Sequence, residues 1–309
     1  MGAIAACGAS GGTPDEDLPG LVHAAKEQAP AIDVDRAAKD PEVLALAVAM
    51  PEHRVTDAIG PHTLIASSRV EVTDGGAVVD SLTDNVELAD GGAEFHGTDN
   101  NSADYGREVI ATGNQLYLRP RYARWHVRAP EDGEVAKLRD DFGATLAAHF
   151  DLLAPAIAVV DRGSADAGGR PARRIALEKA PIAHARAQSL AQRKWREGAE
   201  IVAVSGEILL DEKTGAPLHA HVEGQLVFAR DGHRYTMKVT VDHDVKAIGE
   251  KPQVAPPPAD ETVATPERLK EVDERDLLLD GMAPPAKHKQ PGTGTAAGTG
   301  TGSATGAKP

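Results

Sequence analysis

The feature that most constrains this fold is a two-residue periodicity that returns in one segment after another. In a segment that starts at Leu64, Val70 and Val72 face one side, whereas Arg69 and Glu71 face the other. Such alternation is typical of a strand with one buried face. Short runs of Asp, Asn and Gly separate the segments. They predict tight hairpins between antiparallel strands, not alternating strands and helices.

The other expected strands repeat this alternation at a spacing of roughly 8 to 12 residues. They cover residues 77–88, 93–97, 107–112, 115–118, 124–128, 157–160, 172–177, 199–210, 217–230 and 233–248. The last two are the clearest, because Leu226 and Phe228 alternate with polar residues on one, and Tyr235, Met237 and Val239 do so on the next. An Asp-Gly pair joins them, and a meander is the simplest topology.

Two helices are expected beside the sheet. Asp40 is a suitable N-cap and Pro41 a suitable first residue for an almost wholly apolar helix, and Pro51 is expected to end it. Residues 131–153 carry apolar side chains at helical spacing with charged ones between them, which predicts a helix across one face of the sheet. A basic stretch over 186–196 is either a docking surface for a negative partner or a solvated segment.

Low-complexity segments set the expected domain limits. Residues 8–39 form a polar tether and an N-terminal segment, and residues 40–249 form the antiparallel-sheet domain. Residues 250–282 form a Pro-rich linker and a short charged helix. Residues 283–309 consist mainly of Gly, Thr, Pro and Ala, so a disordered tail is expected there.

The charge of the chain disfavours whole classes of partner. Its formal net charge is −14, from 33 basic and 47 acidic residues, and only 3% of its residues are aromatic. Phosphate backbones and anionic membrane surfaces would not be attracted to such a chain, and few rings are present on which single-stranded bases could stack. We therefore expect no nucleic-acid partner.

The single cysteine, Cys7, points to a location. Residues 4–8 read Ile-Ala-Ala-Cys-Gly, which resembles a bacterial lipobox. In lipoproteins the thiol after such a run is alkylated with diacylglycerol and becomes the mature N-terminus. The resemblance implies that residues 1–7 are a truncated signal remnant, since the basic and apolar parts of a secretory signal do not precede the run. It also implies membrane attachment through lipidated Cys7. The alternative is an ordinary thiol in an alanine-rich terminus.

Four short motifs lie in a familiar layout. Residues 104–110 read Asp-Tyr-Gly-Arg-Glu-Val-Ile, residues 115–119 read Gln-Leu-Tyr-Leu-Arg, residues 124–128 read Arg-Trp-His-Val-Arg, and residues 169–175 read Gly-Arg-Pro-Ala-Arg-Arg-Ile. With three long strands after a helix, this layout resembles the LolA/LppX-like lipoprotein carriers over residues 40–249. The resemblance implies an α+β fold in which a curved antiparallel sheet, a half-open barrel, packs on one or two helices, with disordered tails at both ends.

The same resemblance implies a role in binding a lipid or acyl chain in a cavity between sheet and helix. Six apolar residues are the expected lining of that cavity, although each is also a plausible core residue. They are Trp125, Leu226, Phe228, Tyr235, Met237 and Val239.

The histidines of the last hairpin offer an alternative chemistry. His219 and His221 lie two residues apart on the polar face of one expected strand, and His243 lies on the next. The hairpin between these strands is expected to place His219 opposite residue 244. Imidazoles beside carboxylates such as Glu223 can ligate zinc. This predicts, with lower weight, a metal-dependent periplasmic hydrolase. The oxygen-rich residues 99–104 are a weaker calcium candidate, because they lack the loop glycine and terminal glutamate of an EF-hand.

The leading hypothesis is therefore a lipid-anchored, non-enzymatic protein of the cell envelope. We expect it to bind an apolar ligand or an envelope partner and to need no cofactor, and no nucleophile elbow or P-loop is present in the sequence. Gly8 replaces the aspartate that marks inner-membrane retention in many lipoproteins, which favours the outer membrane, facing the periplasm. A purely structural interaction module is a further alternative.

Overall fold

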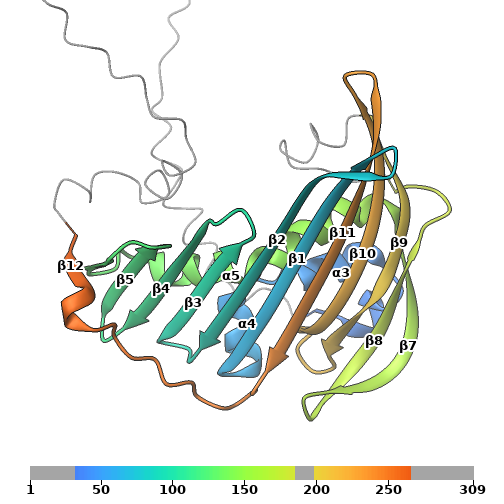
Figure 1. Ribbon diagram of the computed structural model, residues 1–309. Helices are drawn as coiled ribbons and strands as arrows, with labels where there is room; N and C mark the ends of the chain where they lie inside the picture. Colours follow the sequence, from blue (N-terminus) through green and yellow to red (C-terminus); the bar gives the residue numbers. More distant parts are fainter. Residues whose placement is uncertain (1–31, 185–197, 266–309) are drawn as a thin grey trace, which may run out of the picture. The chain divides into compact units, whose positions relative to one another are not determined.

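One antiparallel sheet dominates the computed structural model, which describes residues 32–184 and 198–265 (Figure 1). The twelve strands of the sheet follow the order β12-β6-β5-β4-β3-β2-β1-β11-β10-β9-β8-β7. Their bounds are β1 His62–Asp74, β2 Ala77–Asp90, β3 Phe95–Asn101, β4 Gly106–Thr112, β5 Gln115–Pro120, β6 Trp125–Arg128, β7 Ile157–Ala167, β8 Arg170–Lys179, β9 Ala199–Asp211, β10 Pro217–Arg230, β11 His233–Lys246 and β12 Thr262–Ala264.

The topology is two meanders joined in the middle of the sheet. Strands β1 to β6 form one and β7 to β11 the other, and β1 pairs with β11 so that Val70 lies opposite Val239. The short β12 adds to β6 in parallel, with Thr262 opposite Trp125. Because β7 and β12 end the order without pairing to each other, the sheet does not close. The expected half-open antiparallel architecture is confirmed.

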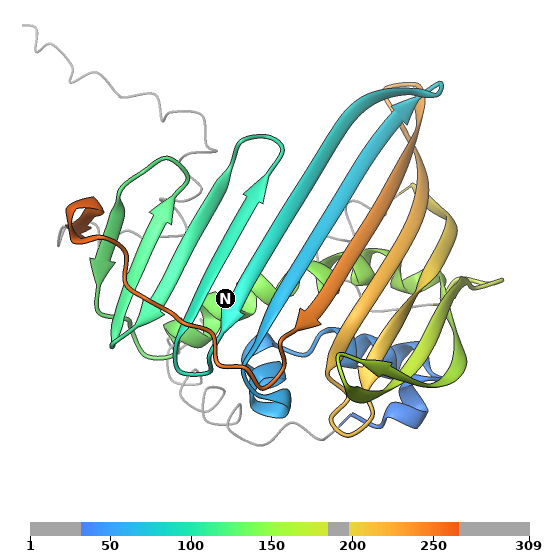
Figure 2. The ribbon, with the colours of Figure 1, turned by 60° about the horizontal axis from the view of Figure 1, so that its bottom comes forward.

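Short 3₁₀ turns occupy Ala154–Ala156 and Ala259–Glu261. The four described α-helices all lie on one side of this sheet (Figure 2). They are α2 Val34–Ala37, α3 Pro41–Val48, α4 Glu52–Ile59 and α5 Glu134–Leu153. We call the side of the sheet that they cover the inner face, and the opposite side the outer face. The predicted cap of α3 is present, because Asp40 accepts a hydrogen bond of 3.0 Å from the Glu42 amide.

Helix α4 was not expected from the sequence. Pro51 ends the preceding helix as expected, but it also stands directly before α4, and proline is well tolerated at a helix start. Val55 and Ile59, one turn apart, are buried, whereas Asp57 stays exposed. The helix is therefore held by a narrow apolar stripe that a short window of sequence shows only weakly.

Two apolar clusters fill the space between helices and inner face. In one, α3 and the second half of α5 pack on β8 to β11. In the other, α4 and Phe142 of α5 pack on β1 to β5 and neighbouring strands. Burial of each large side chain contributes about 1.5–3 kcal/mol, so these clusters hold α5 across the sheet as the helical spacing of residues 131–153 predicted.

Glycines let α5 approach the strands closely. A Cβ atom at Gly97 of β3 would lie 2.5 Å from the Phe142 ring, and one at Gly224 of β10 would lie 2.4 Å from the Leu153 side chain. Each position therefore accommodates a helix side chain directly against the backbone of the sheet.

Several expectations lie outside the described residues. They are the signal remnant and Cys7, most of the tether, the basic stretch over 186–196, the charged helix after residue 265 and the C-terminal tail. Within the described ranges, no helix has the length and apolarity that crossing a bilayer requires.

Candidate functional site: the inner face and its surroundings

Five of the six expected lining residues lie together on the inner face. Leu226, Met237 and Val239 are almost fully buried in the cluster beneath α3 and α5. Leu226 lies opposite Met237 in the β10–β11 register, and the next pair on the same face toward the hairpin tip is Phe228 opposite Tyr235. The rings of that pair stack with centroids 5.4 Å apart. Burial decreases along the hairpin, so the three residues nearer the helices belong to the core.

Beyond this core the inner face remains apolar but is only half-buried. Phe228, Tyr235, Val70, Val72 and Ile201 all have intermediate exposure. They come from neighbouring strands, because Val72 lies opposite Met237 and Ile201 lies opposite Leu226. We call these five half-buried side chains the apolar end of the inner face.

Trp125 does not belong to this group. It is buried, but it lies on the outer face beside Arg119, whose guanidinium stands 4.4 Å from its ring centroid. Five strands separate β6 from β11 in the sheet order. The expectation that Trp125 shares a cavity with the β10–β11 residues is wrong, because the alternation of a four-residue strand gave no indication of which face its tryptophan occupies.

The histidines of the last hairpin are divided between the two faces. His219 and His221 lie on the outer face, where Nδ1 of each bonds the carboxylate opposite it, of Asp244 at 2.8 Å and of Asp242 at 2.7 Å. The predicted pairing of His219 with residue 244 is confirmed. His243 points to the inner face, so the three-histidine site expected for a hydrolase does not form. Among the described residues, no group of three or more acidic, His or Cys side chains is arranged to hold a metal ion.

In residues 99–104, the candidate calcium loop, polar side chains accept hydrogen bonds from protein groups. Oδ1 of Asn101 accepts hydrogen bonds from the amides of Ala103 and Tyr105, both at 3.0 Å. Asp104 accepts a bond from the Tyr122 hydroxyl at 2.8 Å. The calcium reading is therefore not supported by the contacts of this loop.

His243 is a buried titratable group of the inner face. It is 3% exposed, and neither ring nitrogen makes a hydrogen bond of normal geometry with a described residue. Burial lowers its pKa to about 4, and the nearby Pro217 carbonyl and Asp244 offset this only in part. His243 is thus a neutral side chain at physiological pH, built into the packed interior.

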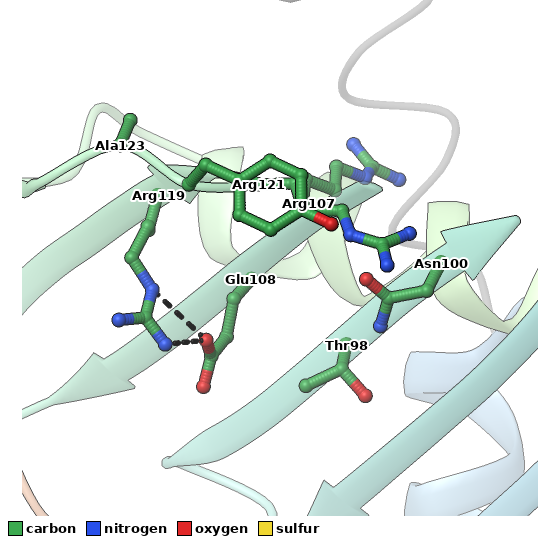
Figure 3. A pocket seen from close by; sticks show the side chains of 8 residues that line it. Thr98, Asn100, Arg107, Glu108, Arg119, Arg121 and Ala123 are labelled. Carbon is green, nitrogen blue, oxygen red and sulfur yellow. Dashed lines mark hydrogen bonds and ion pairs between the residues drawn. The ribbon is translucent and has the colours of Figure 1, made fainter. Parts of the chain in front are cut away.

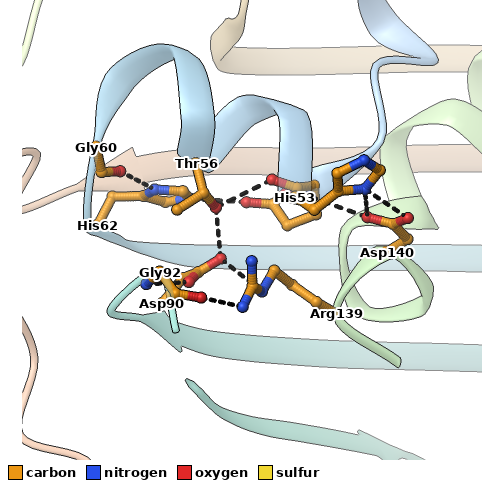
Figure 4. Close-up of polar contacts among 9 residues, drawn as sticks. His53, Thr56, Gly60, His62, Asp90, Gly92, Arg139 and Asp140 are labelled. Carbon is orange, nitrogen blue, oxygen red and sulfur yellow. Dashed lines mark hydrogen bonds and ion pairs between the residues drawn. The ribbon is translucent and has the colours of Figure 1, made fainter. Parts of the chain in front are cut away.

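A second group of polar residues is buried where α4, α5 and the ends of β1 and β2 meet (Figure 4). His62 Nε2 lies 2.7 Å from Glu52 Oε1, and His62 Nδ1 lies 2.9 Å from the Gly60 carbonyl oxygen. Both ring nitrogens therefore face acceptors, which an imidazolium satisfies by donating from both. Burial alone would lower the pKa of His62, but the hydrogen bond and charge of Glu52 outweigh it, and the pKa is raised.

Asp90 and Arg139 form the other half of this buried group. Arg139 Nε lies 3.2 Å from Asp90 Oδ2, and the same guanidinium donates to the Gly92 carbonyl. The Thr56 hydroxyl donates to Asp90 at 2.5 Å. These side chains join α4, α5 and β2, and each charge has an opposite partner, as burial requires. We call Glu52, Thr56, His62, Asp90 and Arg139 the buried polar cluster.

The buried polar cluster was missed by sequence reasoning, although a signal was present. Arg139 falls on the helical phase of Phe142 and Leu146, and His62 falls on the strand phase of Leu64. A charged residue on an apolar phase indicates a buried pair when a partner of opposite charge occupies a similar position elsewhere.

The outer face carries a hollow of about 430 Å³ over β3 to β5 (Figure 3). Thr98, Glu108 and Arg119 form a row across these three strands, because each lies opposite the next in the register. Arg119 donates two hydrogen bonds to the Glu108 carboxylate, one from Nε at 3.1 Å and one from a terminal guanidinium nitrogen. Other lining residues are Asn100, Arg121 and Tyr122. The hollow lies on the opposite face from the apolar end.

Comparison with known proteins returns structures but no sequence family. No protein-family model matches the chain, and no curated protein matches it. Similar solved structures include the lipoprotein LppX of Mycobacterium tuberculosis, with 12% identity over 70% of this chain and 100% of that one at a TM-score of 0.28. LprF from Mycobacterium bovis has 11% identity over 71% of this chain and 98% of its own, at a TM-score of 0.29.

A LolA superfamily protein from Nitrosomonas europaea is also similar, with 7% identity over 68% of this chain and 96% of its own at a TM-score of 0.19. LppX and LolA are the two proteins that give their names to the carrier family that this sequence resembles.

Proposed function

We propose that this protein is a lipid-anchored, non-enzymatic component of the cell envelope that binds an acyl chain or similar apolar ligand at the apolar end of its inner face. The observation that carries the proposal is the contiguous patch of Val70, Val72, Ile201, Phe228 and Tyr235, which adjoins the core and remains half-buried. A contiguous apolar patch that the fold leaves partly accessible is typical of a binding surface.

The neighbouring contacts support an uncharged ligand portion. A polar contact beyond the apolar end is the pair of His233 Nδ1 and Asp74 Oδ2, 2.9 Å apart at the tip of the two hairpins. Each member of this pair is therefore already engaged by the other. A ligand here would gain mainly from covering apolar surface, about 25 cal/mol for each Å² removed from water, with its polar end toward the hairpin tips.

The first test is the Val72→Asp variant, with Thr73→Asp as its control. The two residues are adjacent on β1 and face opposite sides of the sheet, so both variants add one carboxylate to the same strand. Purified protein is titrated with a fluorescent fatty acid, and organic extracts of the protein as isolated are analysed by mass spectrometry.

We expect Val72→Asp to weaken fatty-acid binding at least tenfold, because the new carboxylate would have to be desolvated beside the acyl chain of the ligand. Thr73→Asp should leave binding within about twofold, since it changes the opposite face. Equal effects of the two variants, or no binding by the unaltered protein, would refute the proposed site.

The anchor is a separate part of the proposal and rests on the lipobox resemblance at Cys7. We expect the protein made in a Gram-negative host from its natural gene to begin at Cys7 and to carry a diacylglyceryl adduct in the intact mass. Cys7→Ser should lack the adduct and leave the membrane fraction. An unmodified chain in the unaltered protein would contradict the anchor but not the ligand site.

A further inference from the structure

We propose that the hollow on the outer face over β3 to β5 is a binding site for a neutral saccharide. This inference does not depend on the proposed function, because the hollow and the apolar end lie on opposite faces of the sheet. Its volume of about 430 Å³ falls within the range typical of small-molecule sites.

The charges around the hollow exclude a simple anion site. Each arginine whose guanidinium borders the outer-face hollow already has a carboxylate partner: Arg119 bonds Glu108, and Arg121 lies 3.1 Å from Asp104. The Arg107 guanidinium is directed to the inner face, 4.8 Å from the centroid of the Phe142 ring of α5. Glu261 is a second acidic neighbour, 3.6 Å from Arg119. The carboxylates thus match or outnumber the guanidinium groups, so a phosphate or sulfate would meet no uncompensated positive charge.

The polar groups of the hollow instead suit a ligand with several hydroxyl groups. Glu108 is held from two sides, by His96 at 2.7 Å and by Arg119, which fixes its carboxylate in the row. Thr98 and Asn100 add groups that both donate and accept hydrogen bonds. Preorganised carboxylate, guanidinium, amide and hydroxyl groups can each bond a sugar hydroxyl, which is itself donor and acceptor.

Tyr122 supplies a fixed aromatic surface beside these groups. Its side chain is largely exposed, yet its hydroxyl donates to Asp104 at 2.8 Å and the Arg121 guanidinium stands 5.0 Å from its ring centroid. Its φ of 66° is unusual for a residue with a bulky side chain. A strained backbone that holds an exposed ring in place is typical of a functional position. The flat ring offers apolar surface for the C–H face of a sugar.

The loop that carries Tyr122 is built to fit against β4. The Arg121 amide donates to the Gly106 carbonyl at 2.8 Å, and a Cβ atom at Gly106 would lie 2.4 Å from the Asn100 side chain. Because Gly106 has no side chain, Asn100 can pack directly against its backbone, and the loop with Arg121 and Tyr122 can bond to the same residue.

The test is saturation-transfer NMR on the full chain with methyl glycosides of neutral hexoses and N-acetylhexosamines, and with their 1,4-linked disaccharides. Tyr122→Ala removes the aromatic surface and Tyr122→Phe retains it. The matched control is Tyr105→Ala, because Tyr105 is an exposed tyrosine of the preceding loop that does not line the hollow. Melting temperatures verify that all variants are folded.

We expect at least one glycoside to bind, Tyr122→Ala to weaken its binding at least tenfold, and Tyr122→Phe and Tyr105→Ala to stay within about threefold. Inorganic phosphate should not compete. Absence of signal from every glycoside, competition by phosphate, or equal binding by Tyr122→Ala would overturn the assignment. Loss of fatty-acid binding would not bear on it, so the two proposals fail separately.

Discussion

The Nε2 atom of His62 lies 2.7 Å from Oε1 of Glu52, and neither side chain is more than 3% exposed. The pair joins the start of β1 to the first turn of α4, and through Glu52 it meets α5. A Cβ atom at Gly143 of α5 would lie 2.6 Å from a Glu52 carboxylate oxygen. Helix α4 is thus held by charge as well as by its narrow apolar stripe.

Replacing His62 by Gln should destabilise the protein by about 3 kcal/mol, since the carboxylate of Glu52 would remain buried without an opposite charge. Urea unfolding at pH 7 measures the change. His53→Gln is the control, because His53 makes a comparable bond to Asp140 at 2.8 Å but is about one-third exposed. It should cost less than about 1 kcal/mol. Equal losses in the free energy of unfolding would show that the stabilisation by the His62–Glu52 pair does not depend on its burial.

Asp90 and Arg139 should behave as one unit in a double-mutant cycle. Asp90→Asn and Arg139→Gln each leave a buried charge without its partner, so each should cost about 3 kcal/mol. The double variant should cost at least 1 kcal/mol less than the sum of the two. Additive losses in urea unfolding would mean that the 3.2 Å contact contributes no coupling.

Stability should fall as the pH is lowered from about 6.5 to 5, because His243 has its pKa lowered to about 4 while the unfolded chain takes up a proton near 6.5. The unfolded state then binds more protons, which costs about 2 kcal/mol over this interval. The raised pKa of His62 acts in the opposite sense: its stabilising contribution is complete below about 6.5 and is lost as the pH rises through its folded pKa. The two effects therefore occupy different pH ranges.

Urea midpoints of His243→Met and of the unaltered protein at pH 6.5 and 5 measure the effect of His243. The difference in free energy of unfolding between the two proteins should narrow or reverse at pH 5. A constant difference would show that His243 takes up its proton equally in the folded and unfolded states.

Gly97→Ala should destabilise the protein by about 1–3 kcal/mol, because the added methyl group would lie 2.5 Å from the Phe142 ring. The same change in a Phe142→Leu background should cost clearly less, since the smaller side chain relieves the overlap. Thermal unfolding of the four proteins gives the coupling. If Gly97→Ala costs the same in both backgrounds, the close approach of α5 to β3 is not the cause.

The elements that sequence predicted well are those whose local signals agree. An Asp-Gly turn and strict alternation predicted β10 and β11, including the pairing of His219 with Asp244. Helix α5 followed from its apolar spacing. The site was harder to predict, because which face a short strand presents depends on distant partners. The expected three-histidine site needs His219 and His243 on one face, whereas the β10–β11 register puts them on opposite faces. Trp125 lies beside Arg119 on the outer face and not in the expected cavity.

The central pairing of β1 with β11 has a consequence for how the chain acquires its structure. Residues that face each other there, such as Thr63 with Lys246 and Asp74 with Tyr235, are roughly 160 to 180 residues apart in sequence. During synthesis β1 must wait, with one side unpaired, until nearly the whole domain has been made. Such long-range pairing slows folding, and an unpaired strand edge invites association with other chains. Refolding should therefore be slow and sensitive to protein concentration, and the nascent protein should benefit from a chaperone that shields this edge.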